Sequence, residues 1–259
     1  MSFKSFELHP QIQAGVEALG YEEPTPIQSR CIPLILNGRD VMGMAQTGTG
    51  KTAAFGLPIL QRLMSGPRRR VRALIIAPTR ELAEQIHEAI GQLGRKTKVK
   101  SVTVYGGVKQ NPQVRKLREG AEIVVACPGR LLDLMDQGVI DLSGMEVLVL
   151  DEADRMFDMG FMPDVRRILG RIPAKRQTLL FSATMPEEIR DLARDILKDP
   201  VTVQVGEAAP VSTVSHALYP VEQHLKTALL MKILDRTDTD SVLVFTRTKD
   251  RATRVAKSL

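Results

Sequence analysis

The stretch VMGMAQTGTGKT, residues 41–52, joins a short apolar run to a loop that contains two glycines, a lysine and a second threonine. Three local structures share this pattern: a dinucleotide-binding turn, a phosphate-binding loop (P-loop) that precedes a helix, and an ordinary strand-to-helix turn. Each of them makes a different demand on the residues that follow. The rest of the chain therefore has to discriminate between them.

A dinucleotide site needs an acidic residue about 20 positions further on, at the end of the next strand. The next apolar run ends in APTR (77–80), which has no carboxylate at this place. A P-loop needs a small residue, four others and then Gly-Lys-Thr, and AQTGTGKT has alanine where glycine is usual. An ordinary turn has little reason to begin a helix with Gly-Lys. We favour the P-loop, in which backbone N–H groups wrap phosphates, Lys51 supplies a positive charge and the Thr52 hydroxyl binds Mg²⁺.

Short apolar runs recur along the chain, and each of them is too short to be a helix. Helical patterns, such as 81–93, 113–118 and 187–197, separate most of these runs. The expected strands are 41–44, 73–77, 101–105, 123–126, 147–150, 178–181 and 201–205. Strands that are apolar on both faces and alternate with helices predict an α/β fold, with a parallel sheet covered by helices on both faces. Ligands of such sheets bind beyond the carboxyl ends of the strands.

An acidic cluster, DEAD (151–154), follows the expected strand at 147–150 and therefore lies at this ligand-binding edge. Carboxylates this close together repel one another, and a Mg²⁺ ion relieves the repulsion. We expect Asp151 to hold the metal together with Thr52, and Glu152 to polarise the water that attacks a γ-phosphate. The alternative is a helix N-cap followed by a first-turn charge. Beside a P-loop, the cluster favours nucleotide hydrolysis.

The composition excludes several classes of protein. Lys and Arg outnumber Asp and Glu by 36 to 30 in the 259 residues, and this net charge of +6 suits an anionic partner without demonstrating one. Cys31 and Cys127 have no histidine at metal-ligand spacing, so we expect buried thiols of a reduced compartment. No apolar run reaches the roughly 18 residues of a membrane span, and no signal-peptide pattern is present. We expect a soluble, cytoplasmic protein without a membrane partner.

The alternation of strands and helices breaks near Gly206, where the sequence becomes small, polar and punctuated by proline. A helix at 226–234, a strand at 242–245 and the start of another helix follow. These elements are too few to bury a core of their own. The expected domains are 1–206, a linker at 207–216, and 217–259 as the incomplete beginning of a second domain.

Taken together, these residues resemble the DEAD-box RNA helicases over nearly the whole chain. Seven elements stand in the family's order: GYEEPTPIQ (20–28), AQTGTGKT (45–52), PTRELA (78–83), GG (106–107), PGR (128–130), DEAD (151–154) and SAT (182–184). The resemblance implies a RecA-like P-loop NTPase domain, ATP and Mg²⁺ as cofactors, and ATP hydrolysis coupled to RNA binding and local duplex unwinding. DEADRMFDMGF and RQTLLFSATMP further suggest a bacterial member of the RhlE kind.

For ATP, the resemblance implies that the side-chain amide of Gln28 pairs with the adenine edge, so that ATP is preferred to GTP. Phe6 and Tyr21 occupy the positions of aromatic residues near the base, with ordinary core contacts as the alternative. The expected ATP-binding residues are Phe6, Tyr21, Thr25, Gln28, Ala45, Gln46, Thr47, Gly48, Thr49, Gly50, Lys51 and Thr52. The expected catalytic residues are Lys51, Asp151 and Glu152.

For RNA, the resemblance implies contacts from three turns that each follow a strand. The expected residues are Pro78, Thr79, Arg80, Gly106, Gly107, Cys127, Pro128, Gly129 and Arg130. Helix N-termini and glycines offer backbone N–H groups to phosphates, so we expect binding that is indifferent to base sequence. The 2′-hydroxyl would then distinguish RNA from DNA. A plain turn is the alternative for Gly106 and Gly107.

Two further expectations concern single side chains. The family usually has threonine where this chain has Cys127, and because a thiol donates weakly, this contact to phosphate is open. Ser182 and Thr184 are expected to contact Asp154 and to couple the nucleotide site to RNA binding. A cap of the following helix is a compatible second role for the two hydroxyls.

The basic stretches PRRRVR (67–72) and GRKTKVK (94–100) precede strands, at the edge opposite the ligands, and we interpret them as solvated surface. The family's ARGxD-like and HRxGRxxR-like segments, which belong to its second lobe, do not occur in these 259 residues. An arginine of this kind contributes about 10³ to 10⁵ in rate in other NTPases. We therefore expect this polypeptide to bind nucleotide, to hydrolyse it slowly and not to unwind RNA. An ATP-gripped RNA clamp and a DNA translocase are the alternative functions.

Overall fold

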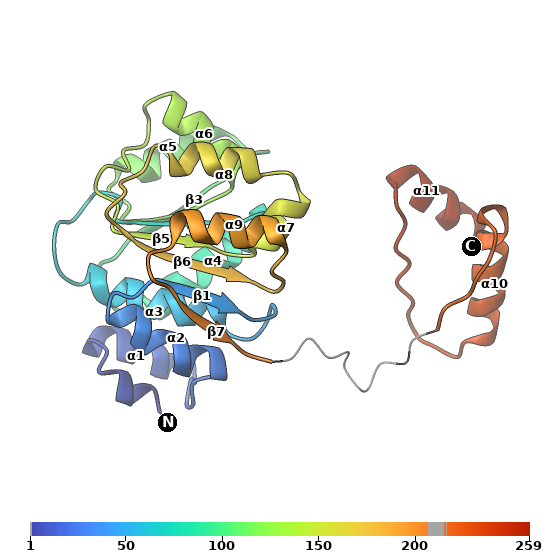
Figure 1. Cartoon of the computed structure of the whole chain (residues 1–259), viewed down its shortest axis with the longest axis horizontal. Coiled ribbons are helices and arrows are strands. Elements are labelled where there is room, and N and C mark those ends of the chain that lie inside the picture. Colours follow the sequence, from blue (N-terminus) through green and yellow to red (C-terminus); the bar gives the residue numbers. More distant parts are fainter. Residues whose placement is uncertain (1, 207–214, 216) are drawn as a thin grey trace. The chain divides into compact units, whose positions relative to one another are not determined.

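The computed structural model describes residues 2–206, 215 and 217–259 (Figure 1). The chain divides into two compact units, Met1–Glu207 and Ala208–Leu259. The linker predicted at 207–216 lies outside the described residues, except for Ser215.

Strands and helices alternate along the first unit. The strands are β1 Val41–Met44, β2 Ala73–Ile76, β3 Ser101–Val104, β4 Ile123–Ala126, β5 Val147–Leu150, β6 Gln177–Ser182 and β7 Val201–Gln204. The helices are η1 Phe3–Phe6, α1 Pro10–Ala18, α2 Pro26–Leu36, α3 Lys51–Leu63, α4 Arg80–Leu93, α5 Gln110–Arg118, α6 Pro128–Asp136, α7 Ala153–Asp158, α8 Met162–Leu169 and α9 Glu187–Ile196. All seven predicted strands are present, with ends that differ by at most one residue.

The seven strands form one sheet in the order β3-β4-β2-β5-β6-β1-β7, and every neighbouring pair is parallel. All carboxyl ends therefore meet at one edge. β1 lies between β6 and β7, whereas β2 lies between β4 and β5. The loop after β1 is consequently near the loops after β5 and β6, while the loops after β2, β3 and β4 form a neighbouring group.

Both faces of the sheet are buried, as the continuous apolar runs predicted. Ile75 faces a core that it shares with residues of α1 to α4, whereas Leu74 and Ile76 face a second core with residues of α6 to α9. Figure 1 shows α1, α2 and α3 on one side of the sheet and α6, α8 and α9 on the other. Successive strand side chains point to opposite faces, so two helical layers need apolar residues at every strand position.

One basic residue of the stretch at 67–72 departs from the expectation of solvated surface. Arg72 is 3% exposed, and its Nε lies 2.6 Å from Glu146 Oε1. Its guanidinium also donates to the carbonyl of Ser65. Arg72 directly precedes β2, so its side chain fixes the start of a central strand, and the expectation was wrong for this residue.

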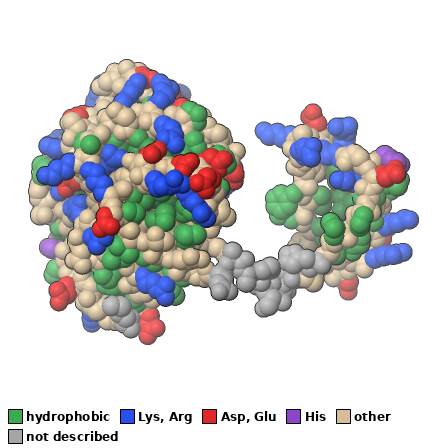
Figure 2. All heavy atoms as spheres, viewed as in Figure 1, with side chains coloured by type: hydrophobic (Ala, Val, Ile, Leu, Met, Phe, Trp, Pro, Cys, Tyr) green, Lys and Arg blue, Asp and Glu red, His purple; other side chains and the backbone are tan. Residues whose placement is uncertain are grey.

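The second unit contains η2 Gln223–Leu225, α10 Lys226–Arg236 and α11 Lys249–Ser258, which agree with the predicted helices. The strand predicted at 242–245 is not formed. A strand requires hydrogen bonds from a neighbouring strand, and residues 217–259 contain none. Leu243 and Phe245 are 78% and 87% exposed, and Figure 2 shows hydrophobic side chains on the surface of this unit.

Among the described residues, no helix combines the length and the apolar character that a bilayer crossing requires.

Two helical glycines provide a test of the packing. A methyl group on Gly15 of α1 would overlap the carbonyl oxygen of Leu93 at the end of α4, whereas one on Gly91 would meet nothing within 4 Å. Alanine favours a helix over glycine by about 0.5–1 kcal/mol. We predict that Gly91→Ala raises the free energy of unfolding by this amount and that Gly15→Ala lowers it by about 1–3 kcal/mol through overpacking. Urea unfolding of both variants measures the difference, and a stabilised Gly15→Ala variant would contradict the close approach of α1 to α4.

Candidate nucleotide and RNA site at the carboxyl edge of the sheet

The predicted P-loop connects β1 to α3 and is shaped by two glycines with positive φ, Gly48 at 86° and Gly50 at 91°. Its first residue is tied to the sheet, because the Ala45 N–H donates to the carbonyl of Ser182 at 3.1 Å. Lys51 begins α3 directly after the loop. The N–H groups of the first helical turn have no partner within the helix, so they face the loop and favour an anion there.

Lys51 and Asp151 face each other at the base of the loop, and both are buried, with exposed side-chain fractions of 5% and 3%. The distance from Lys51 Nζ to Asp151 Oδ1 is 3.7 Å, which is too long for a hydrogen bond. Among the described residues, Lys51 Nζ has no hydrogen-bond partner. A buried ammonium without hydrogen bonds is costly, and a phosphate oxygen would satisfy it.

Burial raises the pKa of Asp151 to about 6, and the nearby Glu152 carboxylate raises it as well, although Lys51 acts in the opposite direction. A cation beside Asp151 would stabilise its charged form. The residues present fit Mg²⁺, because the Thr52 hydroxyl and the Asp151 carboxylate are hard oxygen donors. Within the described residues, no group of three or more His, Cys, Asp or Glu side chains forms a cage for a metal. Mg²⁺ commonly binds through one or two protein oxygens together with water and substrate phosphates.

Glu152 is held between the loop and α7. Thr47 Oγ1 donates to Glu152 Oε1 at 2.9 Å, and Arg155 Nη1 lies 3.4 Å from Oε2. The backbone of Glu152 is left-handed, with φ 52° and ψ 53°, a conformation that costs a non-glycine residue of order 1 kcal/mol or more. The contact with Thr47 directs this carboxylate toward the loop, as a water-polarising role requires.

Gln28 lies against the loop. Its Oε1 accepts from the Thr25 N–H at 2.9 Å, and its Nε2 donates to the carbonyl of Gly50 at 3.1 Å. Thr25 Oγ1 donates to the carbonyl of Thr49 at 2.8 Å. One donor and one acceptor position of the Gln28 amide make no hydrogen bond among the described residues, the residue is 3% exposed, and its pairing with adenine stays a prediction. Gln28 thus links the start of α2 to the P-loop.

The two aromatic candidates have different surroundings. Phe6 is 7% exposed and packs edge-on against Phe3, with ring centroids 5.9 Å apart. Tyr21 is 41% exposed, although its ring also contacts Phe3. Core contacts therefore dominate at Phe6, and Tyr21 offers the more accessible ring.

Asp154, Ser182 and Thr184 come together as predicted. Asp154 Oδ2 accepts from both the N–H and the Oγ1 of Thr184, each at 2.8 Å, while the Asp154 N–H donates to Ser182 Oγ at 3.1 Å. Burial would raise the pKa of Asp154, but the two hydrogen bonds from Thr184 outweigh it and lower the pKa. These bonds join the segment after β5 to the segment after β6. The coupling role of the three residues stays a prediction.

The three predicted RNA-binding turns follow β2, β4 and β3, which are neighbours in the sheet. Thr79 caps α4 by accepting from the Leu82 N–H at 3.3 Å. Arg130 of α6 donates to the carbonyl of Val108 at 3.4 Å and so connects the turn after β4 to the glycine turn after β3. The sheet therefore places the three turns along one stretch of its carboxyl edge, beside the P-loop and Asp151.

The sequence reasoning missed two residues that support this edge. The Tyr105 hydroxyl donates to Glu84 Oε1 at 2.5 Å, and the guanidinium of Arg80 lies 5.8 Å from the centroid of the Tyr105 ring. Burial tends to raise the pKa of Glu84, but the hydrogen bonds from Tyr105 and Thr103 lower it overall. The position of Tyr105, directly before Gly106 and Gly107, was the signal available in the sequence.

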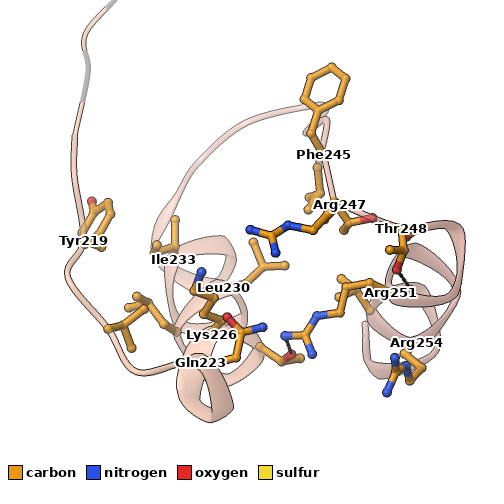
Figure 3. A pocket seen from close by; sticks show the side chains of 16 residues that line it. Tyr219, Gln223, Lys226, Leu230, Ile233, Phe245, Arg247, Thr248, Arg251 and Arg254 are labelled. Atoms are coloured by element: carbon orange, nitrogen blue, oxygen red, sulfur yellow. Dashed lines mark hydrogen bonds between the residues drawn. The ribbon is translucent and has the colours of Figure 1, made fainter. Parts of the chain in front are cut away.

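A cavity of about 700 Å³ lies elsewhere, in the second unit. Figure 3 shows Leu230 and Ile233 of α10 on one side and Arg251 of α11 on the other. Lys226 and Arg247 also line it. Loop residues such as Val244 and Phe245 complete its lining, and residues 217–259 contain no strand on which the two helices could pack.

Comparison with known proteins assigns this architecture to a class. A family model described as DEAD/DEAH box helicase matches residues 25–192. The crystal structure of a DEAD box protein from the hyperthermophile Methanococcus jannaschii superposes with a TM-score of 0.75 at 34% identity, covering all of this chain and 69% of that one. The fold is thus the RecA-like α/β fold of such proteins, and the chain belongs to the DEAD/DEAH box helicase family.

Curated bacterial relatives are similar over the whole chain. The ATP-dependent RNA helicase DeaD of Escherichia coli (strain K12) is 45% identical over 260 residues, which cover 100% of this chain and 41% of the relative. The DEAD-box ATP-dependent RNA helicase CshA of Geobacillus kaustophilus is 40% identical over 259 residues, 100% of this chain and 55% of the relative. The chain thus spans about two fifths to just over half of these relatives' lengths. The RhlE-like subgroup stays a prediction.

Cys127 provides a test of the turn between β4 and α6. It occupies the N-cap position of α6 with extended backbone and makes no side-chain cap hydrogen bond. Burial raises the pKa of its thiol to about 11, so the thiol is protonated at neutral pH. Since a threonine hydroxyl accepts from the free N–H groups of the first turn, we predict that Cys127→Thr raises the free energy of unfolding by about 1 kcal/mol. Cys127→Ala, which adds no acceptor, is the control, and equal stability of the two variants in urea would contradict the prediction.

Proposed function

We propose that the protein is an RNA-dependent ATPase of the DEAD-box type, with ATP bound at residues 45–52 and RNA bound by the turns after β2, β3 and β4. The single observation that carries this proposal is the buried ammonium of Lys51, which has no hydrogen-bond partner among the described residues. A phosphate at the start of α3 supplies that partner. The names of the relatives, ATP-dependent RNA helicases, support the choice of nucleotide and polymer.

In this proposal each residue of the nucleotide site has a distinct task. Lys51 donates to a phosphate oxygen, and the backbone N–H groups of the loop bind the others. Thr52 and Asp151 hold Mg²⁺, which when bound offsets the negative charge of the phosphates. Glu152 accepts a proton from the attacking water while the bond between the γ-phosphorus and the bridging oxygen breaks. Gln28 reads adenine with its remaining donor and acceptor.

The RNA part rests on chemistry that recognises phosphate. The first turns of α4 and α6 and the glycine turn present backbone N–H groups at one stretch of the sheet edge, and Arg80 and Arg130 add guanidinium groups. These groups contact sugar and phosphate, so binding is independent of base sequence. The hydrogen bonds of Asp154 with Thr184 and Ser182 lie at the nucleotide site, where they are suited to transmit its state.

We further propose that residues 1–206 form the nucleotide-binding lobe and that residues 217–259 begin a second lobe, with 207–216 as the linker. In a DEAD-box enzyme the second lobe supplies arginines that stabilise charge on the γ-phosphate. A polypeptide of these 259 residues is then a weak ATPase and does not unwind duplexes. A cytoplasmic location is part of the proposal and is consistent with two free cysteines.

Removal of the Lys51 charge tests the nucleotide site. We predict that Lys51→Met weakens binding of Mg²⁺-ATP by about 10- to 150-fold, because a charge-assisted hydrogen bond contributes about 1.5–3 kcal/mol. The control is Lys175→Met, which removes an exposed lysine elsewhere on the same unit. Calorimetric titration measures both affinities, and thermal unfolding verifies that each variant is folded. Equal affinity for ATP in the two variants would refute the proposed site.

Hydrolysis by the 259-residue polypeptide tests the division of labour between lobes. We predict slow single-turnover cleavage of ATP that RNA accelerates little, since the arginines worth about 10³ to 10⁵ in rate are absent from this sequence. Glu152→Gln preserves an acceptor for Thr47 but cannot take a proton, so it should bind ATP normally and cleave it more slowly still. Robust RNA-stimulated turnover by this polypeptide would show that the second lobe is dispensable.

A further inference from the structure

A basic groove lies beside the predicted RNA-binding turns and is not part of them. It has a volume of about 560 Å³ and runs along α5, with Arg115 and Arg118 on the helix, Arg69 at one end, and Gln110 and Asn111 at the other. Val114, Glu119 and Val139 complete the lining, so one carboxylate lies among the arginines. We call these residues the α5 groove.

The charges of the α5 groove are available to a ligand. Among the described residues, Arg69 and Arg118 form no ion pair, and the pair of Arg115 with Glu119 is a 3.7 Å contact between side chains that are 76% and 58% exposed. Exposed pairs of this kind are worth little and yield readily to a better anion. Three guanidinium groups and the one carboxylate of Glu119 leave the groove with two net positive charges, which attract phosphate.

Arg69 is held in place by the fold. Its backbone has φ 61°, and its N–H donates to Glu122 Oε1 at 3.3 Å. The charge of Glu122 is already matched by Arg68, whose Nε lies 2.7 Å from the same oxygen. A Cβ atom on Gly120 would lie 2.7 Å from Arg69 Cβ, so glycine at this position permits the close approach. Non-glycine residues with left-handed backbone occur often at functional sites, so the conformation of Arg69 suggests a binding role. The side chains of Arg68 and Arg72 have carboxylate partners, whereas the Arg69 side chain forms no ion pair among the described residues.

The position of the groove indicates which anion it binds. α5 starts three residues after Gly107, and Arg130 donates to the carbonyl of the intervening Val108. A nine-residue helix is about 13 Å long, comparable to the spacing of two or three phosphates along a strand. We propose that an RNA strand which leaves the glycine turn continues along the α5 groove, where Arg115, Arg118 and Arg69 bind its phosphates. This inference rests on the proposed function, because it extends the proposed RNA path by a second surface.

The test is the salt dependence of RNA binding by the whole chain. Fluorescence anisotropy would measure affinities for labelled oligouridine of about 5 and about 15 nucleotides, which lie near the two ends of the range that single-strand-binding OB folds cover. The variant is Arg115→Gln/Arg118→Gln, which retains the helix and removes two charges. The matched control is Lys4→Gln/Lys175→Gln, which removes two exposed charges away from the groove. Arg115→Lys/Arg118→Lys restores the charge, and Arg69→Gly removes the third guanidinium without disturbing a positive φ.

For the longer RNA, we expect the slope of log affinity against log salt to fall by about 1.4 in the groove variant, since each lost phosphate contact contributes about 0.7 for a single strand. Arg69→Gly should lower it by about half as much. For the longer RNA, the control pair and the lysine variant should retain the parent's slope. For the shorter RNA, every variant should have the slope that the parent has with that RNA. A groove variant with the slope of the control pair, or an equal loss with the shorter RNA, would overturn the inference.

Two other outcomes concern both this inference and the proposed function. If the parent chain binds neither RNA, the proposed RNA site fails and the groove assignment fails with it. A second outcome is that the groove variant binds RNA like the parent, while polyglutamate binds the parent and not the variant. In that case the groove binds an acidic protein segment instead. In that case the proposed function stands and the present inference is overturned.

Discussion

Lys51 and Asp151 lie opposite each other under the P-loop, both almost completely removed from water, at a distance that excludes a hydrogen bond between them. Burying two opposite charges costs several kcal/mol per ion unless further hydrogen bonds are made. Here the ammonium has no hydrogen-bond partner among the described residues, and burial raises the pKa of the carboxylate, which disfavours its charged form. The site is therefore incompletely compensated in this state, and in the proposed function a phosphate with its metal ion would complete it. The rest of the carboxyl edge is arranged around this pair.

The sheet order divides one edge into two neighbouring groups of loops, which we propose bind nucleotide and RNA. β1, β5 and β6 place the P-loop, the acidic cluster and Ser182 together, while β2, β4 and β3 place the three turns with Arg80, Gly107 and Arg130 next to them. The boundary between the groups is the pair β2 and β5, which are hydrogen-bonded neighbours. The two groups of loops therefore adjoin at β2 and β5, with no strand between them. Asp154 spans the nucleotide half by its bonds to Ser182 and Thr184.

The P-loop of this structure is already ordered by side chains from outside it. Thr25 and Gln28 donate to carbonyls of Thr49 and Gly50, and Thr47 donates to Glu152. These bonds satisfy polar groups that would otherwise be unpaired near a buried site. They also connect the segment proposed to read adenine, the loop and the candidate general base in one network. Preorganisation of this kind reduces the ordering cost of binding.

The sequence by itself determined the class of the protein and most of the local structure. Seven apolar runs were sufficient to predict seven strands, because strands buried on both faces leave no polar positions, and ordered motifs were sufficient to indicate the P-loop, the acidic cluster and the RNA turns. It placed Asp151 beside the P-loop through the metal ion that the two are expected to share, but it could not give the strand order or the contact of Arg80 with Tyr105. The buried role of Arg72 and the unpaired backbone at 242–245 were also beyond it. Such features depend on contacts between residues far apart in the chain, and only the tertiary structure decides which strands become neighbours, which charges are buried and which faces remain uncovered.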